Sequence, residues 1–254
     1  MTNQYNKRVF IVSQKIKKCL DESALAQEII TKDYKTTNYD LRWGLKPMRY
    51  GNVINIDIKA AYPKTLINYG LITPDVFKRL MALDKMERLP AFGMLAKKMT
   101  VFTYDNGECV DWDIETGKYA QVFYFVIAQV ENLMQELKKI AGEYYLFHWV
   151  DGIFLDWYTP KNILDQIMKT IEAHDYFFSF ENINECHIDR DDTIVSCRLI
   201  KNGMEKEFKF ADRNMINLYN DILNVLENDS IHLQRDVAPD LQLPEGNPVD
   251  DLPM

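Results

Sequence analysis

The chain has 254 residues, of which 47% are hydrophobic and 27% are charged, and its formal net charge is −8. This composition fits a globular protein of one domain with appendages, or of two small domains. No apolar run approaches the ~20 residues of a membrane span, and the polar start at residues 1–4 does not resemble a signal peptide. We therefore expect a cytoplasmic protein whose four cysteines are reduced and mostly buried.

The charge is distributed unevenly along the chain. Residues 1–50 hold ten Lys/Arg against five Asp/Glu, whereas residues 227–254 hold seven acids against Arg235 alone. Aromatic residues are interleaved with the basic segment, at Tyr34, Tyr39, Trp43 and Tyr50. Such a segment predicts phosphate contacts and base stacking on nucleic acid. A solvated basic helix with ordinary aromatic residues is the alternative.

Local patterns predict the elements in chain order. The N-terminal part is expected to contain a strand over Arg8–Val12, a helix over 14–31 capped by Ser13, irregular chain over 33–50, a strand ending at Asp57, and a helix from Pro74 to about Arg88. The remainder is expected to contain a hairpin of Thr100–Tyr104 with Cys109–Ile114, a helix over 118–140, a hairpin around Asp151, a helix from Pro160 to about 173, a strand over 176–180, a hairpin of Thr193–Ile200 with Glu205–Phe210, and a helix over 213–227. This order predicts an α+β fold, an antiparallel sheet with helices packed on one face.

The segment Asp57-Ile58-Lys59-Ala60-Ala61-Tyr62-Pro63 follows a strand-forming run. It resembles the first palm motif of family B DNA polymerases, D-x-x-S-L-Y-P, in which a carboxylate ends a buried strand before a Tyr-Pro turn. The resemblance implies that Asp57 binds a catalytic metal ion. It also implies that Tyr62 is a steric gate against the 2′-hydroxyl of ribonucleotides; a plain core tyrosine is the alternative.

A second resemblance surrounds Asp151-Gly152, which interrupts two strand-forming runs. The family's third palm motif is a hairpin of the form Y-x-D-T-D-S-I. Alignment on Ile153-Phe154 gives Asp151 the position of the second, metal-binding aspartate. Trp149 then stands where the family has its first aspartate, and Gly152 stands where it has Ser.

A third resemblance lies between them, where Lys85–Gly93 reads K-M-E-R-L-P-A-F-G. It is similar to the fingers motif K-x-x-x-N-S-x-Y-G, with Leu89 and Pro90 in place of Asn and Ser. The resemblance implies that Lys85 neutralises the triphosphate of the incoming nucleotide. Lys78 lies two turns earlier on the same face of the expected helix and would complete a phosphate clamp; a solvated helix face is the alternative for both.

Nucleotidyl transfer uses two metal ions, and Mg²⁺ needs only one or two protein carboxylates besides water and phosphate oxygens. Asp57 and Asp151 are therefore the expected ligands of Mg²⁺ or Mn²⁺, and Asp156 is a weaker third candidate. Two unrelated turn acids are the alternative. Arg198 and Lys206 are candidates for the family's thumb contact with nucleic acid.

The resemblance covers about residues 40–200. The expected organisation is a basic N-terminal segment over 1–50, a palm over 51–185 with reduced fingers at about 64–93, a thumb-like region over 186–228, and a disordered acidic tail over 229–254. The end of the tail resembles the acidic tip of bacterial single-stranded-DNA-binding proteins, which implies contacts with replication proteins; a solubilising tail is the alternative.

These resemblances predict a minimal DNA polymerase of the phage or mobile-element type, without a proofreading exonuclease and located in the host cytoplasm if viral. Its partners would be a DNA primer–template and deoxynucleoside triphosphates. The competing hypothesis is a catalytically inactive palm that acts as a nucleic-acid-binding or assembly subunit. The replacements at Leu89, Pro90 and Trp149 favour that hypothesis.

Overall fold

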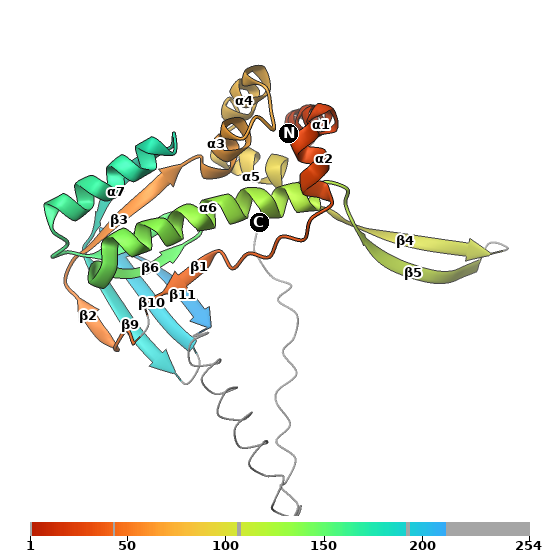
Figure 1. Cartoon of the computed structure of the whole chain (residues 1–254). Coiled ribbons are helices and arrows are strands. Elements are labelled where there is room, and N and C mark those ends of the chain that lie inside the picture. Colours follow the sequence, from red (N-terminus) through yellow and green to blue (C-terminus); the bar gives the residue numbers. More distant parts are fainter. Residues whose placement is uncertain (1, 43, 106–107, 192–193, 212–254) are drawn as a thin grey trace, which may run out of the picture. The chain divides into compact units, whose positions relative to one another are not determined.

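The computed structural model describes residues 2–42, 44–105, 108–191 and 194–211, which belong to one compact unit. The fold is α+β, as expected, and its sheets are antiparallel (Figure 1). No helix in the described ranges is long and apolar enough to cross a membrane. The predicted helix over 213–227, the acidic tail and Trp43 lie outside the described residues.

A five-stranded sheet forms the centre of the fold. In spatial order its strands are β1 (Tyr39–Leu41), β6 (Tyr145–Trp149), β7 (Gly152–Asp156), β3 (Val53–Lys59) and β8 (Phe177–Ile183). The register places Asp57 opposite Gly152 on β7 and opposite Ser179 on β8. The expected strand to Asp57 and the expected hairpin around Asp151 are confirmed, and they are neighbours in the sheet.

Two helices cover one face of this sheet, α6 (Ala120–Ala141) and α7 (Lys161–Ala173) (Figure 1). Strand β3 directs Ile54, Ile56 and Ile58 to that face, because alternate residues of a strand point to the same side. These side chains are at most 3% exposed, and burying each contributes roughly 1.5–3 kcal/mol. The opposite face therefore receives the odd-numbered residues of β3, which include Asp57.

A second, four-stranded sheet packs on part of that opposite face. Its strands are β11 (Met204–Ala211), β10 (Ile194–Lys201), β9 (Glu185–Asp191) and β2 (Met48–Tyr50). Aromatic rings form the core between the two sheets, with Phe147 stacked on Phe154 at a centroid distance of 4.3 Å. Cys186 and Cys197 are buried here as free thiols, as expected.

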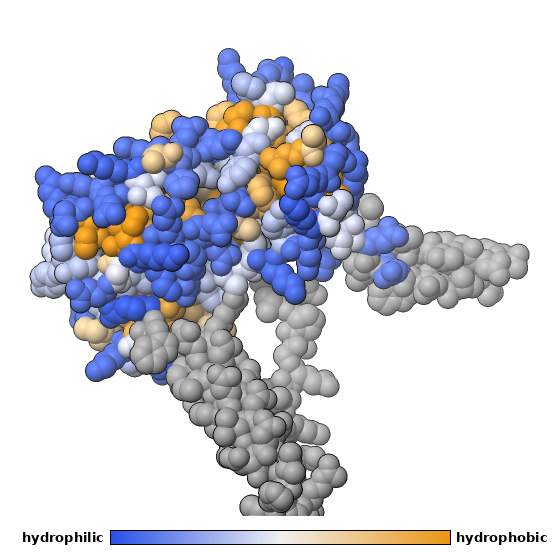
Figure 2. Space-filling view, viewed as in Figure 1, coloured by the Kyte–Doolittle hydropathy of each residue, from blue (hydrophilic) through white to orange (hydrophobic). Residues whose placement is uncertain are grey.

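A cluster of helices forms the remaining core. It contains α1 (Thr2–Glu22), α2 (Ala24–Ile30), α3 (Ala61–Asn68), α4 (Pro74–Met81) and α5 (Lys85–Gly93), packed against part of α6. On the face shown in Figure 2, apolar side chains form small groups in a mainly hydrophilic surface, and one group lies over these helices. The hairpin of β4 (Lys98–Asp105) and β5 (Glu108–Thr116) connects α5 to α6, as expected.

The expected strand at Arg8–Val12 is wrong, because these residues lie within α1. Val9, Val12, Ile16 and Leu20 recur every three or four residues and form a buried stripe. This helical period outweighs the β-propensity of the short apolar run. The single helix expected over 14–31 with Ser13 as its cap is also wrong, because α1 ends at Glu22 and α2 spans Ala24–Ile30. Ser13 is buried inside α1, and α2 is capped by Ser23, whose hydroxyl accepts from Ala26 N at 3.2 Å.

The expected helix from Pro74 to Arg88 is two helices, since α4 ends at Met81 and α5 begins after Asp84. Asp84 and Glu87 form a reciprocal capping box, in which Glu87 N donates to Asp84 Oδ1 at 2.9 Å. This signal was present in the sequence as D-x-x-E. Two further short strands, β1 and β2, lie in the segment 33–50 that was expected to be irregular.

The other expected elements are confirmed with small shifts of their bounds. They are α6, α7, β8 and the hairpin of β10 with β11, in which Lys201 is opposite Met204. A short 3₁₀ helix, η1 (Gly142–Tyr144), leads from α6 into β6. The Asp151 turn joins β6 to β7. It therefore follows the long helix α6, which packs on the same sheet.

Candidate functional site

A pocket of about 710 Å³ lies where β3 ends and the β6–β7 turn begins. Four residues to which the sequence assigned a metal-binding or nucleotide-binding role line it: Asp57, Tyr62, Lys85 and Asp151. They come from three segments that are far apart in the chain, namely the end of β3 with the start of α3, the first turn of α5, and the β6–β7 turn. The fold therefore brings the three motif segments together around one cavity.

The backbone holds the two acids on neighbouring strands. Asp57 is opposite Gly152, and Ile58 N donates to the carbonyl oxygen of Asp151 at 2.9 Å. A Cβ at Gly152 would lie 3.3 Å from Asn55 Oδ1 and 3.7 Å from Asp57 Oδ1. A side chain in place of Gly152 would thus crowd the acid pair.

Two residues of this pocket have a left-handed backbone, Ala60 at φ 50° and Val150 at φ 56°. Such a conformation is unusual for alanine and more so for β-branched valine, and costs about 1–3 kcal/mol per residue. Val150 N donates to Asn38 O at 2.6 Å, which helps to hold the turn. Strained residues therefore flank both acids, a pattern typical of functional sites.

The electrostatics of the pocket destabilise the charged forms of the two acids. Burial, and then the neighbouring Asp57 carboxylate, raises the pKa of Asp151 to about 6. Burial also raises the pKa of Asp57, against the opposing effect of Lys59 and Lys85. Each raised pKa means that the charged carboxylate is destabilised where it lies. A bound divalent cation would remove this penalty.

The donor set fits Mg²⁺ or Mn²⁺. In the part of the chain that the structure describes, no three His, Cys, Asp or Glu side chains form a metal cluster, but Mg²⁺ keeps several waters and takes one or two carboxylates. Asn55 Oδ1 is a buried acceptor near the pair that has no hydrogen-bond partner among the described residues. Two carboxylates and a spare oxygen acceptor are hard ligands of the kind these ions prefer.

Tyr62 has features of both alternatives that the sequence left open, a steric gate and a core tyrosine. Its ring lines the pocket, and it also stacks on Phe92 at 5.0 Å with an interplanar angle of 22°. Phe92 stacks in turn on Phe123 at 4.8 Å. Burial, with a further effect from Asp151, raises the pKa of Tyr62. The ring is therefore a rigid wall of the pocket, supported from behind by the helical core.

Trp149, which stands where the family has an aspartate, lines the pocket and packs in an aromatic cluster. It stacks on Tyr39 at 5.6 Å, and its centroid lies 5.3 Å from those of Phe208 and Phe210. The indole thus connects the end of β6 with β1 and β11. At this position the chain has apolar packing and no metal ligand.

Several predicted residues lie elsewhere. Lys78 is exposed on α4, a different helix from the one that carries Lys85, so the expectation of one shared helical face is wrong. Tyr50 is 8% exposed and packs between the two sheets, which prevents it from stacking on a base. Asp156 lies at the opposite end of β7 from Asp151 and accepts from Tyr158 N at 2.9 Å.

The two thumb candidates lie on the second sheet. Arg198 forms an ion pair with Glu205 at 3.0 Å. Lys206 is exposed, lies over the Phe208 ring at 4.6 Å, and is close enough to Asp151 to lower the pKa of that acid. Of the two, Lys206 is the one with an electrostatic connection to the pocket.

Sequence reasoning missed Lys59 and Arg88, which also line the pocket. Lys59 Nζ lies 3.7 Å from Asp57 Oδ2. Arg88 follows Lys85 by three residues on α5, and this spacing on a helix was the available signal.

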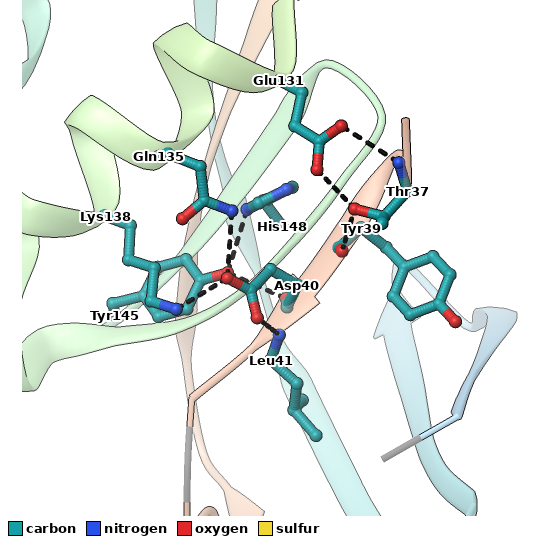
Figure 3. Close-up of polar contacts among 9 residues, drawn as sticks. All are labelled: Thr37, Tyr39, Asp40, Leu41, Glu131, Gln135, Lys138, Tyr145 and His148. Atoms are coloured by element: carbon teal, nitrogen blue, oxygen red, sulfur yellow. Dashed lines mark hydrogen bonds and ion pairs between the residues drawn. The ribbon is translucent and has the colours of Figure 1, made fainter. Parts of the chain in front are cut away.

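Sequence reasoning also missed a polar network that holds the base of the β6–β7 hairpin (Figure 3). Lys138 and Gln135 of α6 donate to Asp40 Oδ2 at 2.6 and 3.0 Å. Tyr145 Oη donates to the Asp40 carbonyl at 2.8 Å and lies 2.9 Å from His148 Nδ1. The network connects β1, α6 and β6 a few residues before Asp151.

No protein-family model matches the chain, and a search of curated proteins found no match.

Proposed function

We propose that the chain is a DNA polymerase with a palm-like sheet, a nucleotidyltransferase that adds deoxynucleotides to a DNA primer. One observation carries the proposal: Asp57, Tyr62, Lys85 and Asp151 line the same pocket. The sequence assigned all four to a single reaction, whereas two unrelated turn acids, a core tyrosine and a surface lysine would have no reason to share a cavity. The roles also agree with the chemistry of the pocket, which has two acids, three basic side chains and an aromatic wall.

Asp57 and Asp151 would hold Mg²⁺ or Mn²⁺, with Asn55 Oδ1 as a further oxygen nearby. When bound, such ions activate the primer 3′-hydroxyl and stabilise the leaving oxygen. Lys59 would hold the Asp57 carboxylate in place through its 3.7 Å contact. Lys85 would neutralise the triphosphate, and the Tyr62 ring would fill the volume that a ribose 2′-hydroxyl needs.

The competing function, an inactive palm that binds nucleic acid or assembles with replication proteins, is favoured by Trp149. Its aromatic packing against Tyr39, Phe208 and Phe210 contributes to stability where the family has an acid. The competing function predicts binding without synthesis. The two proposals therefore differ in whether the protein produces an extended primer.

Primer extension with Mg²⁺ or Mn²⁺ and all four deoxynucleotides is the deciding experiment. The parent protein is expected to extend, and Asp57→Asn and Asp151→Asn are each expected to abolish extension because each removes a charged metal ligand. Asp33→Asn, which changes an exposed acid outside the pocket, is the matched control. Thermal unfolding without metal checks the fold, and neither pocket variant should be less stable, since each relieves repulsion between the acids.

Two outcomes would count against the proposal. Activity within a few-fold of the parent in either pocket variant would remove the metal assignment. Absence of extension by the parent under every ion and nucleotide condition, together with retained DNA binding, would favour the inactive palm.

A further inference from the structure

We propose that Arg88 is a second phosphate-binding residue of the pocket, and that Lys85 and Arg88 together hold the polyphosphate of a nucleoside triphosphate. The inference rests on the proposed function and specifies how its substrate is held. It gives Arg88 the role that the sequence had assigned to Lys78.

The geometry of α5 directs both cations into the pocket. Residues three apart on a helix are neighbours on its surface, with about 5–6 Å between their Cβ atoms. Lys85 and Arg88 line the pocket together with Asp57 and Asp151. Lys85 is near enough to both acids to lower their pKa values. Cations on α5 and acids at the sheet end thus border one cavity, which suits a polyanion bound with divalent metal.

Arg88 has hydrogen-bonding capacity that the described chain leaves unused. Its Nε is buried and finds no acceptor in the described ranges, and its Nη1 donates to Met81 Sδ at 3.6 Å. A thioether is a weak acceptor, and a buried donor without a partner is costly. Phosphate oxygens would supply strong acceptors for the planar guanidinium.

Among the described residues, neither cation is held in an ion pair at contact distance. Neither Lys85 nor Arg88 forms an ion pair with a described residue. Glu87, which precedes Arg88 in the sequence, is 4% exposed, and its Oε2 accepts from Asp84 N at 3.2 Å within the capping box. The box also fixes the start of α5, so both cations extend from a helix with a defined first turn. Lys78 does not line the pocket.

The test measures binding of Mg²⁺ with deoxyadenosine tri-, di- and monophosphate to the full chain by isothermal titration calorimetry. The parent is expected to bind the triphosphate most tightly. Arg88→Gln should weaken triphosphate binding by about 10- to 100-fold, the loss of one or two hydrogen bonds to a charged group. Monophosphate binding should change by less than about threefold, since the lost contact is to the outer phosphates.

Two further variants make the result specific. Arg88→Lys keeps the positive charge but lacks the planar guanidinium, and it should recover only part of the affinity for the triphosphate. Lys78→Gln removes a cation outside the pocket and should bind like the parent. Thermal unfolding verifies that each variant is folded; if Arg88→Gln is not, Arg88→Lys alone should still show weakened triphosphate binding.

Three results would overturn the inference: triphosphate binding by Arg88→Gln equal to that of the parent, equal losses for tri- and monophosphate, or no nucleotide binding by the parent. Primer extension separates this inference from the proposed function. Extension with an unchanged nucleotide KM in Arg88→Gln contradicts the clamp alone. Arg88-dependent binding without any extension contradicts the polymerase alone.

Discussion

The β6–β7 hairpin has a covered part and an open part on the same face of the central sheet, and they differ in chemistry. In the covered part, Phe147 and Phe154 are at most 5% exposed under the second sheet. In the open part, one residue pair further along, Gly152 lies opposite Asp57 at the edge of the pocket. Residues paired across antiparallel strands share a face, so the β7–β3 pair changes from the buried ring of Phe154 to the carboxylate of Asp57 within two residues.

This difference shows how the fold tolerates an unfavourable site. Burial raises the pKa of both acids, and the Asp57 carboxylate raises that of Asp151 further, which makes their charged forms a cost to stability. Apolar burial in the covered part stabilises the same hairpin and offsets that cost. We therefore expect substitutions in the covered part to reduce stability and substitutions in the open part to reduce activity.

The largest expected effect on stability is in the covered part. Phe154→Ala removes a ring that contacts Phe147 and Phe208, and should reduce the free energy of unfolding by about 3–5 kcal/mol. Asp57→Asn should not reduce it. Urea denaturation of the two variants side by side measures the contrast. Equal destabilisation by both would show that the two parts are not separate in function.

A smaller effect on stability is expected at His148 of β6, which is fully buried on the helix side of the sheet. Burial lowers the pKa of His148 to about 4, with Asp40 and Glu131 opposing and Lys138 reinforcing the shift. The unfolded chain takes up this proton near the ordinary value of ~6.5, so stability should fall as pH decreases from about 6.5 towards 4, by at most about 3 kcal/mol.

His148→Gln tests this dependence, because glutamine does not titrate. The loss of stability between pH 7.5 and pH 5 should be smaller in the variant than in the parent, measured by urea denaturation at each pH. His174→Gln, which changes an exposed histidine on the surface, is the control. An undiminished pH dependence in His148→Gln would assign the effect to other groups.

Tyr62 is expected to affect both activity and stability, because its ring forms a wall of the pocket and also belongs to an aromatic stack. Tyr62→Ala is expected to admit ribonucleotides and to lose some stability, whereas Tyr62→Phe should keep most of the discrimination because the ring does the excluding. Incorporation of both nucleotide types, measured beside thermal unfolding, checks both. A folded alanine variant that still refuses ribonucleotides would leave Tyr62 as a core residue only.

The smallest expected effect concerns the basic N-terminal region. Deletion of residues 1–32 would remove α1 and α2 from the helical core, so charge substitution is the cleaner test. Lys7→Gln, Arg8→Gln and Lys18→Gln together remove three exposed cations of α1. The salt dependence of single-stranded DNA binding should become shallower, by ~0.7 in log–log slope per lost phosphate contact. Lys161→Gln with Lys169→Gln on α7 should leave the slope unchanged.

Local sequence determined much of the fold and selected four residues that the structure places around one pocket. Asp57, Tyr62, Lys85 and Asp151 were found from short motifs, and most strands, hairpins and helices from alternation, turn residues and apolar period. Each of these signals depends on a few neighbouring residues, so it can be recognised before the fold is known. The strand expected at Arg8–Val12 failed because its four-residue apolar run is compatible with either period, and burial against α5 decided for the helix.

Tertiary structure alone decided which cations and aromatic rings reach the pocket. Lys78 and Arg88 are both basic residues of the same sequence neighbourhood, but α4 ends at Met81 and the capping box at Asp84 starts α5. Of the two, Arg88 lines the cavity. Trp149, which stands where the family has an acid, packs in an aromatic cluster because β1 and β11 bring Tyr39, Phe208 and Phe210 to it. Such contacts join residues that are distant in the chain. Their energies depend on interatomic distances in the folded protein, which a local sequence pattern does not predict.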